Sequence, residues 1–327
     1  MSKSLMATAQ APANIAFIKY WGKKDSGLRL PANDSISMNL GGINTTTTVE
    51  FDAQLLADEV IINGQPADER AYGRVVKFLD KIRQLASQDL KAKVTSQNSF
   101  PTGAGLASSA SGFAALALAA VSALQLELSE RELSQLARQG SGSACRSIPD
   151  GFAYWKTADN SVDSFAYSLH SADHWAISDV IALVDQSEKS TSSTDGHKSA
   201  LTSPFFKTRI EEYLPTQLEK VKTALAQRNF KDFGQAIEEE ALNLHAICLT
   251  SKPPAIYWNS ATLSIIHSIR IWREEGLEAY FTIDAGPNVH VLVETKNAER
   301  LKTKLTELPE VEEVLIAQSA VGARVLS

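Results

Sequence analysis

A glycine- and serine-rich segment that leads straight into an apolar stretch constrains this chain more than any other feature. Residues 99–112 read SFPTGAGLASSASG, and strong helix formers continue from Phe113. Gly103 and Gly105 permit backbone conformations and close approaches that other residues do not. The expected helix would present unpaired N–H groups and the positive end of its dipole at the same place. The pattern predicts a phosphate-binding loop, with a plain loop that caps a buried, alanine-rich helix as the alternative.

The loop matches neither of the two common phosphate-binding patterns. A Walker loop needs Gly-x-x-x-x-Gly-Lys-Ser/Thr, and no lysine follows Gly103 or Gly105 at that spacing. A dinucleotide-binding loop needs glycine at position 108, which is serine here. The hydroxyl groups of Ser108, Ser109 and Ser111 are instead available to phosphate oxygens or to a metal ion. We therefore interpret the segment as a phosphate loop of a third kind.

Composition narrows the class of protein. A chain of 327 residues with 44% hydrophobic and 21% charged residues is typical of a globular protein of about two domains. A net charge of −6 argues against nucleic acid and anionic membranes as partners. The two cysteines, Cys145 and Cys248, favour neither a disulfide scaffold nor a cysteine-rich metal site, so a cytoplasmic location is expected. The longest apolar run, residues 112–124, is well short of the ~20 residues that span a bilayer, and the N-terminus lacks a signal-peptide layout.

Hydrophobic periodicity and turn residues predict an α+β fold in two parts. The first part is rich in strands and the second in helices, with a polar loop at 186–202 between them, which places the domain boundary near residue 188 (domains 1–188 and 189–327). Strands are expected at 13–21, 45–51, 59–63, 91–96, 152–155, 165–169, 175–184, 278–283, 289–294 and 310–317. Helices are expected at 68–85, 106–124, 129–140, 204–228 (interrupted near Pro215), 231–247, 260–275 and 297–308. The alternation is too irregular for a doubly wound sheet or a barrel.

Three charged residues stand out beside the loop. On a strand over 13–21, Lys19 shares a face with Ile15 and Phe17, so it should point inward and need a carboxylate or phosphate partner. An edge lysine that reaches water is the alternative. Asp284 follows an expected core strand and precedes Ala-Gly-Pro-Asn, where it could face a cleft or simply stabilise a turn. Arg146 ends a second Gly/Ser segment, in which Ser141 and Ser143 could bind the same oxygens; the alternative is an exposed loop arginine.

The remaining candidate groups carry less weight. Among the histidines, His245 and His267 fall in expected helices and are interpreted as packed or surface residues, while His290 follows the Asp284 turn and could support it. No spacing of His, Cys and Asp suggests a zinc site, and no Gly-x-Ser-x-Gly nucleophile elbow occurs.

Four motifs in order resemble the diphosphomevalonate decarboxylases of the GHMP kinase superfamily. They read APANIAFIKYWGKKD from Ala11, PTGAGLASSASG from Pro101, GSGSACRS from Gly140 and DAGPNVH from Asp284. The resemblance extends along essentially the whole chain. It implies a GHMP kinase fold, with an N-terminal domain like the second domain of ribosomal protein S5 and a ferredoxin-like C-terminal domain, and with the site between them.

The resemblance also implies a reaction. Enzymes of this family use ATP and Mg²⁺ to phosphorylate the 3-hydroxyl of mevalonate 5-diphosphate, and the intermediate loses phosphate and CO₂ to give isopentenyl diphosphate. They are usually cytosolic homodimers.

Residue roles follow from the matching positions. Asp284 matches the aspartate that orients or deprotonates the 3-hydroxyl, Arg146 the arginine that holds the substrate carboxylate, and Lys19 the lysine near the transferred phosphate. Contacts with the substrate are implied for Tyr20, Lys23, Ser141, Ser143, Arg146 and Ser193. ATP contacts are implied for Pro101, Gly103, Gly105, Leu106, Ser108 and Ser109, with Ser108 also on the metal ion. One position departs from the family: His197 stands where relatives commonly carry Met, which we expect to alter loop mobility rather than the reaction.

Other activities remain open at this point. A decarboxylase of mevalonate 5-phosphate would use the same chemistry on a shorter anion. A mevalonate 3-kinase would stop after phosphoryl transfer, and an ATP-binding module would catalyse nothing. The joint presence of Asp284, Lys19 and Arg146 favours the decarboxylase.

Overall fold

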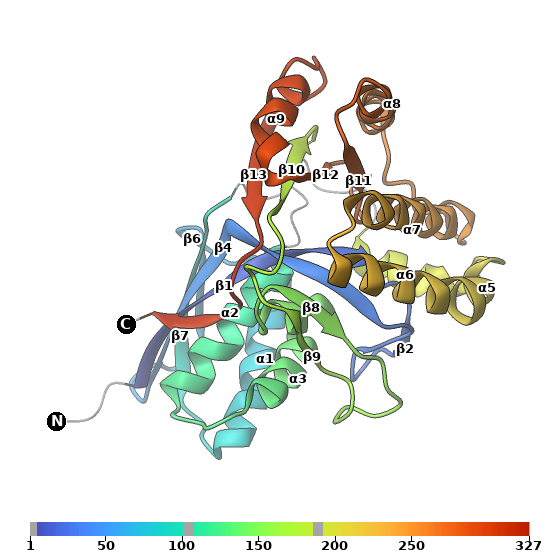
Figure 1. The fold of residues 1–327 in the computed structure, drawn as a ribbon. Coiled ribbons are helices and arrows are strands. Elements are labelled where there is room, and N and C mark those ends of the chain that lie inside the picture. Colours follow the sequence, from blue (N-terminus) through green and yellow to red (C-terminus); the bar gives the residue numbers. More distant parts are fainter. Residues whose placement is uncertain (1–4, 101–107, 186–191, 327) are drawn as a thin grey trace.

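The computed structural model describes residues 5–100, 108–185 and 192–326. Over these residues the chain forms a large mixed sheet and a smaller antiparallel sheet, each packed against helices (Figure 1). This is the α+β arrangement that the sequence predicts. The two parts meet where the long strands of the first half pass beside the helices of the second.

Two long neighbouring strands form the centre of the large sheet. β1 (Leu5–Ile18) and β4 (Ser35–Asp52) pair antiparallel along almost their whole length. β7 (Lys91–Asn98) continues the sheet on the other side of β4. Its remaining strands are β5 (Glu59–Ile62), β6 (Gln65–Pro66), β8 (Phe152–Trp155), β9 (Ala166–His170) and β14 (Arg324–Leu326). A separate hairpin joins β2 (Lys23–Asp25) to β3 (Leu30–Pro31).

Three helices pack together on one face of this sheet (Figure 1). They are α1 (Glu69–Ala86), α2 (Ser108–Ala123) and α3 (Glu130–Gly140). α2 lies against β1 and β4 and buries almost every alanine it carries, so its backbone comes close to the sheet. The predicted capping box of Ser129 and Glu132 begins α3. A 3₁₀ helix, η1 (Gly142–Ser147), follows at once and carries Arg146.

The smaller sheet is covered on both faces, and its strands run in the order β11-β12-β10-β13. Ile177 and Ile181 face the core shared with the first half, whereas Val180 packs into the core on the opposite face. The strands are β10 (Ile177–Leu183), β11 (Ala279–Thr282), β12 (Val289–Glu294) and β13 (Glu313–Gln318). The helical segments of the second half of the chain are α4 (Ser193–Ser199), η2 (Ala200–Thr202), α5 (Phe206–Thr208), the π-helical turn η3 (Arg209–Tyr213), α6 (Leu214–Gln227), α7 (Phe230–Thr250), α8 (Ser260–Glu274), η4 (Thr295–Asn297) and α9 (Ala298–Thr306).

Several local predictions differ from the structure; for example, the strand expected at 45–51 is the second half of β4, and the β2–β3 hairpin was not expected. The first strand begins at Leu5 and ends at Ile18, because pairing with β4 overrides the weak strand propensity of its small residues. The expected loop at 186–202 contains α4, whose N-terminus is capped by the Ser192 side chain; residues 186–191 lie outside the described residues. The sequence gives no sign of β14, a strand that exists through its pairing with β1.

The two halves of the chain are interlaced. β10 precedes residue 188 yet pairs with β12 and β13, and the last strand, β14, returns to the sheet of the first half. The division at residue 188 stays a prediction about domains.

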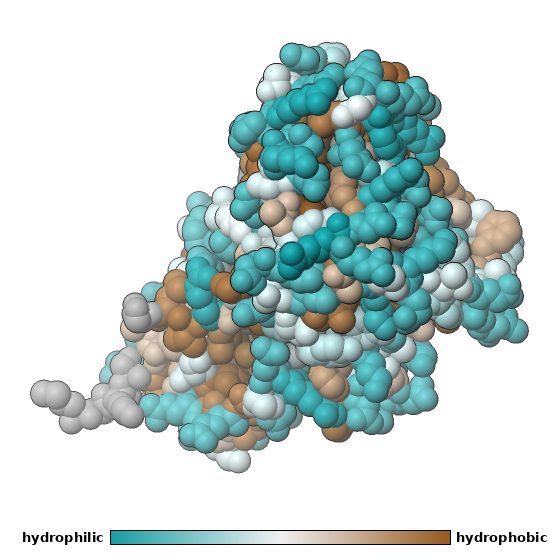
Figure 2. Space-filling model, viewed as in Figure 1, coloured by the Kyte–Doolittle hydropathy of each residue, from teal (hydrophilic) through white to brown (hydrophobic). Residues whose placement is uncertain are grey.

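Hydrophilic side chains cover most of the face seen in Figure 2, and hydrophobic ones gather mainly beside β14, whose Val325 is about half exposed. Among the described residues, no helix combines the length and apolar character required to cross a bilayer.

Two helical glycines provide a test of how tightly α7 packs. A Cβ on Gly234 would lie 1.9 Å from the ring of Tyr280, whereas a Cβ on Gly73 in α1 would meet nothing within 4 Å. We expect Gly234→Ala to lower the free energy of unfolding by about 1–3 kcal/mol. Gly73→Ala should raise it by up to about 1 kcal/mol, because alanine favours helix. Urea unfolding measures both; a Gly234→Ala protein as stable as Gly73→Ala would contradict the packing described here.

Candidate active site

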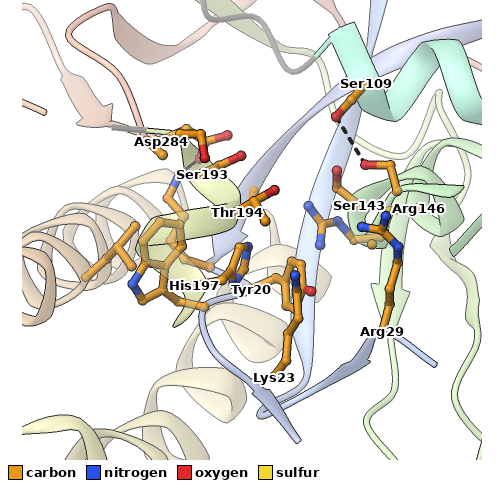
Figure 3. Close-up of a pocket in the computed structure, with 18 of the residues that line it drawn as sticks. Tyr20, Lys23, Arg29, Ser109, Ser143, Arg146, Ser193, Thr194, His197 and Asp284 are labelled. Carbon is orange, nitrogen blue, oxygen red and sulfur yellow. Dashed lines mark hydrogen bonds and ion pairs between the residues drawn. The ribbon is translucent and has the colours of Figure 1, made fainter. Parts of the chain in front are cut away.

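A cavity of about 200 Å³ lies between the two halves of the molecule. Its walls come from the end of β1, the β2 hairpin, α1, α2, η1, α4 and the turn after β11. Figure 3 shows Asp284, Ser193 and Thr194 on one side of the cavity and Ser109 and Ser143 on the other. Segments from both halves of the sequence therefore line one space.

An ion pair joins the two halves at this cavity. Lys19 follows directly after β1, and its Nζ lies 2.6 Å from Oδ1 of Asp284, which follows β11. The lysine side chain is 2% exposed, whereas the aspartate is 31% exposed. The inward direction expected of Lys19 is confirmed, and its partner is a carboxylate.

The surroundings of Asp284 keep it ionised. Burial raises the pKa of this carboxyl, but the Lys19 ammonium, His290 and the Arg146 guanidinium together hold the pKa below its usual range. Asp284 is thus a carboxylate at neutral pH, able to accept a hydrogen bond from a hydroxyl group in the cavity.

Arg146 is a buried cation surrounded by neutral groups. Its side chain donates to Oδ1 of Asn14 at 3.1 Å and 3.3 Å, to Ser37 Oγ at 3.1 Å and to Ser35 Oγ at 2.9 Å. The residue is 4% exposed and lines the cavity. Burial lowers the pKa of Arg146, yet a guanidinium stays protonated in proteins. Within the described part of the chain its hydrogen-bond acceptors are neutral oxygens, so the guanidinium is suited to receive an anion.

Tyr20 and the residues around η1 form the floor of the cavity. The hydroxyl of Tyr20 is buried and has no hydrogen-bond partner among the described residues. A Cβ at Gly142 would lie 2.7 Å from the Tyr20 ring, so only glycine fits there. Ser141 and Ser143 line the same space, and Ser141 Oγ lies 3.1 Å from Ser109 Oγ.

A group of cations forms the remaining wall. Lys23 lines the cavity, and its pKa is lowered to about 8, first by burial and then by Arg29, Lys198 and Arg74. Like charges placed this close are costly unless an anion binds among them.

Sequence reasoning identified Lys23 but missed Arg29, Arg70 and Arg74, which also line the cavity. The i, i+4 spacing of Arg70 and Arg74 places them on one face of α1. No signal in the sequence tells which way that face points.

α4 contributes Ser193 and Thr194 to the wall of the cavity. His197, from the same helix, accepts a hydrogen bond at Nδ1 from the backbone N–H of Gly22 (3.0 Å), and its ring packs on Tyr20 and Trp21. Burial lowers the pKa of His197 well below its usual value, and the charge of Lys23 adds to this effect. A neutral imidazole is the form that can accept this hydrogen bond.

A second cavity of about 200 Å³ adjoins the first, and both are lined by Arg74 and Ser109. It lies between β5, β7, α1 and the N-terminal end of α2, where Ser108 lines it. Val60, Ile62 and other apolar side chains form most of its wall. The predicted ATP contacts Pro101, Gly103, Gly105 and Leu106 lie outside the described residues.

The described residues contain no group of three or more His, Cys, Asp or Glu side chains that could hold a metal ion by themselves. A Mg²⁺ ion bound mainly through phosphate oxygens, water and one or two protein oxygens needs no such group. The hydroxyl of Ser108 at the start of α2 fits that kind of site.

Comparisons with known proteins cover nearly the whole chain. The family model "Diphosphomevalonate decarboxylase-like N-terminal domain" matches residues 11–166, and "Mevalonate 5-diphosphate decarboxylase C-terminal domain" matches residues 179–321. The diphosphomevalonate decarboxylase of Aspergillus fumigatus is 38% identical over 315 residues, which cover 90% of this chain and 78% of the relative.

Solved structures agree with this likeness. The structure described as MDDEF in complex with MVAPP, AMPPCP and magnesium has a TM-score of 0.93 and 42% identity, covering 99% of this chain and all of the other. Mevalonate diphosphate decarboxylase from Staphylococcus aureus has a TM-score of 0.94 and 37% identity, covering 99% of each chain. The expected GHMP kinase fold is thereby confirmed. Both domain models match in order and the relatives align along nearly the whole chain, so this chain belongs to the diphosphomevalonate decarboxylase family.

Proposed function

We propose that this protein converts mevalonate 5-diphosphate to isopentenyl diphosphate, using ATP to phosphorylate the 3-hydroxyl and releasing ADP, phosphate and CO₂. The observation that carries the proposal is the convergence of the Lys19–Asp284 ion pair and the buried Arg146 on one cavity. The relative that binds MVAPP, AMPPCP and magnesium supports it at 42% identity.

Asp284 acts first in this proposal. Its ionised carboxylate accepts the hydrogen bond of the 3-hydroxyl and takes the proton as phosphoryl transfer proceeds. Lys19 keeps Asp284 ionised beforehand and faces the negative charge that develops on the transferred group. Phosphoryl transfer depends mainly on such positioning and charge stabilisation.

Arg146 acts in the second step. The C–O bond at C3 breaks and its electrons leave with phosphate, while the bond to the carboxyl carbon breaks and its electrons form the new C=C bond as CO₂ departs. Arg146 holds the carboxylate in line through its donors, and it cannot serve as an acid because it stays protonated. Its neutral neighbours Asn14, Ser35 and Ser37 leave its charge available to the substrate.

The cations at the far wall favour a diphosphate over a monophosphate. Tyr20, Lys23, Ser141 and Ser143 are the proposed diphosphate contacts, and Arg29, Arg70 and Arg74 add three positive charges to the same space. Ser193, at the start of α4, is proposed to contact the substrate as well. Mevalonate 5-phosphate is the second candidate substrate, since it would present the same hydroxyl and carboxylate groups.

ATP is proposed to bind in the second cavity, with the mostly apolar wall around its base and Ser108 and Ser109 near its phosphates. Pro101, Gly103, Gly105 and Leu106, which lie outside the described residues, are proposed to contact ATP as well. Bound Mg²⁺, held in part by Ser108, would neutralise charge on the phosphates. Ser109 and Arg74 line both cavities, so the nucleotide and the substrate would meet there.

A homodimer and a cytoplasmic location complete the proposal. The homodimer rests on the family resemblance alone. For the location, the two cysteines are free and buried, as is common in a reducing compartment.

The function is tested by measuring ADP and CO₂ together. With ATP, Mg²⁺ and mevalonate 5-diphosphate we expect equal amounts of both products, and a much lower kcat/KM with the monophosphate. ADP without CO₂ would indicate a 3-kinase, and the absence of both products would indicate a binding module.

Asp284→Asn should lose turnover by at least about 1,000-fold while nucleotide binding persists, since the amide cannot take the proton.

Substitution of Arg146 should lower the activity of the protein without lowering its thermal stability. We expect Arg146→Gln to lower kcat by about 100-fold or more, because the carboxylate contact strengthens as the reaction proceeds. The melting temperature should stay equal or rise, since the variant removes a buried cation whose hydrogen-bond acceptors among the described residues are neutral. Arg131→Gln, an exposed arginine paired with Asp163, is the matched control. A change confined to KM would reduce Arg146 to a binding role.

Lys23 should make kcat/KM fall on the alkaline side of its pH profile. Because its pKa is lowered to about 8, the ammonium is present below that pH and is lost as the pH rises through it. We expect kcat/KM for the diphosphate substrate to fall above about pH 8. Lys23→Arg keeps its charge and should move this limb to higher pH, whereas Lys23→Met should remove it and lower kcat/KM throughout. The same basic limb in all three proteins would exclude Lys23 as its source.

A further inference from the structure

The backbone of Lys19 is held by side chains rather than by the sheet. The pairing of β1 with β4 ends at Ile18, so the peptide groups of Lys19 need other partners. Its N–H donates to Oε1 of Glu240 at 2.9 Å, and its carbonyl accepts from Nδ2 of Asn33 at 3.0 Å. Both backbone groups of a residue in the proposed mechanism are thus fixed by buried polar side chains.

Glu240 reaches Lys19 from α7 as part of a fully buried ion pair. Arg209 donates to both carboxylate oxygens of Glu240, through Nη1 to Oε2 at 3.0 Å and through Nη2 to Oε1. Both side chains are 0% exposed. Nη1 also donates to Asn243, one turn further along α7. Oε1 of Glu240 therefore accepts from the Lys19 backbone and from Arg209 at the same time.

Arg209 occupies an unusual backbone position. It is the first residue of η3, the π-helical turn between α5 and α6. A π-helical turn adds a residue to the helix and redirects the side chains around it, and such turns occur frequently at functional sites. Here it brings Arg209 to α7, within reach of Glu240.

Stability alone is a poor explanation for this pair. Apolar residues of similar size in place of a buried ion pair often leave a protein as stable or more stable. We propose that Glu240 and Arg209 are positioning residues, which fix the Lys19 backbone so that its ammonium meets Asp284. This inference rests on the roles proposed above for Lys19 and Asp284.

The consequence can be measured at Asp284. Its charged and titratable neighbours are Lys19 after β1, Arg146 from η1, His290 from β12 and His245 from α7. Burial opposes ionisation of the carboxyl, and Lys19 is the strongest influence in its favour. If Lys19 loses its fixed position, the pKa of Asp284 should rise.

The test compares Glu240→Gln with Glu239→Gln. Glu239 directly precedes Glu240 on α7, but its side chain is exposed and pairs with Lys220 at the surface. For Glu240→Gln we expect a fall in kcat of about tenfold or more and a KM for mevalonate 5-diphosphate within about threefold of wild type. The acid limb of the kcat profile should move up by about one pH unit. Glu239→Gln should match wild type in all three.

A second readout needs no turnover. In protein with ¹³C-labelled aspartate, the carboxyl signal of Asp284, assigned by its loss in Asp284→Asn, should titrate at higher pH in Glu240→Gln than in wild type. If Glu240→Gln does not fold, Arg209→Lys serves as the second variant, because it keeps the charge but loses the two-point contact. It should move both the acid limb of the kcat profile and the titration of the Asp284 signal to higher pH. A folded variant with the wild-type titration overturns the positioning role. Wild-type protein without turnover of the substrate would instead overturn the proposed function, while the titration would still test the positioning.

Discussion

The contact between Lys19 and Asp284 joins residues 265 positions apart and brings an ammonium and a carboxylate to the same cavity. Burial alone would raise the pKa of Asp284, and the Lys19 ammonium is the strongest influence that holds it below its usual range. The carboxylate therefore stays ionised beside the lysine. The rest of the cleft depends on this pair, since it requires the end of β1 and the turn after β11 to come together, and that meeting defines how the two halves face each other.

Among the described residues that line the cavity, positively charged side chains outnumber carboxylates. Arg146 donates to neutral oxygens, and the pKa of Lys23 is lowered first by burial and then by the charges of Arg29 and Arg74. In a chain of net charge −6, such a local concentration of cations is suited to a multiply charged anion. An anion bound among these cations would offset their mutual repulsion.

Much of the fold could be predicted from periodicity and caps. The helix begun by Ser129 and the hairpin turn at Asn63 occur where local chemistry predicts them, because side chains close in sequence decide both. β14 depends on pairing with a strand more than 300 residues away, as in Gln10 with Arg324, and no local pattern contains that information. α4 was missed because its polar residues are typical of a loop.

For the site, sequence reasoning identified residues whose chemistry is unusual for their position, such as a lysine among apolar neighbours. It missed Arg29, Arg70 and Arg74, since arginines on a helix or in a loop are ordinarily solvated and only the tertiary structure turns these toward the cavity. The roles carried over from the family motifs remain predictions about this chain.

The return of the last strand has a mechanical consequence. Because β14 pairs with β1 while β13 pairs with β10, the backbone crosses between the two sheets once after β9 and again after β13. The two sheets are therefore covalently linked at two separate points of the chain, and any movement of one sheet relative to the other must be accommodated at both. None of the described residues that line the two cavities follows β13 in the sequence, so the last strand contributes to the site only through the sheet that it extends.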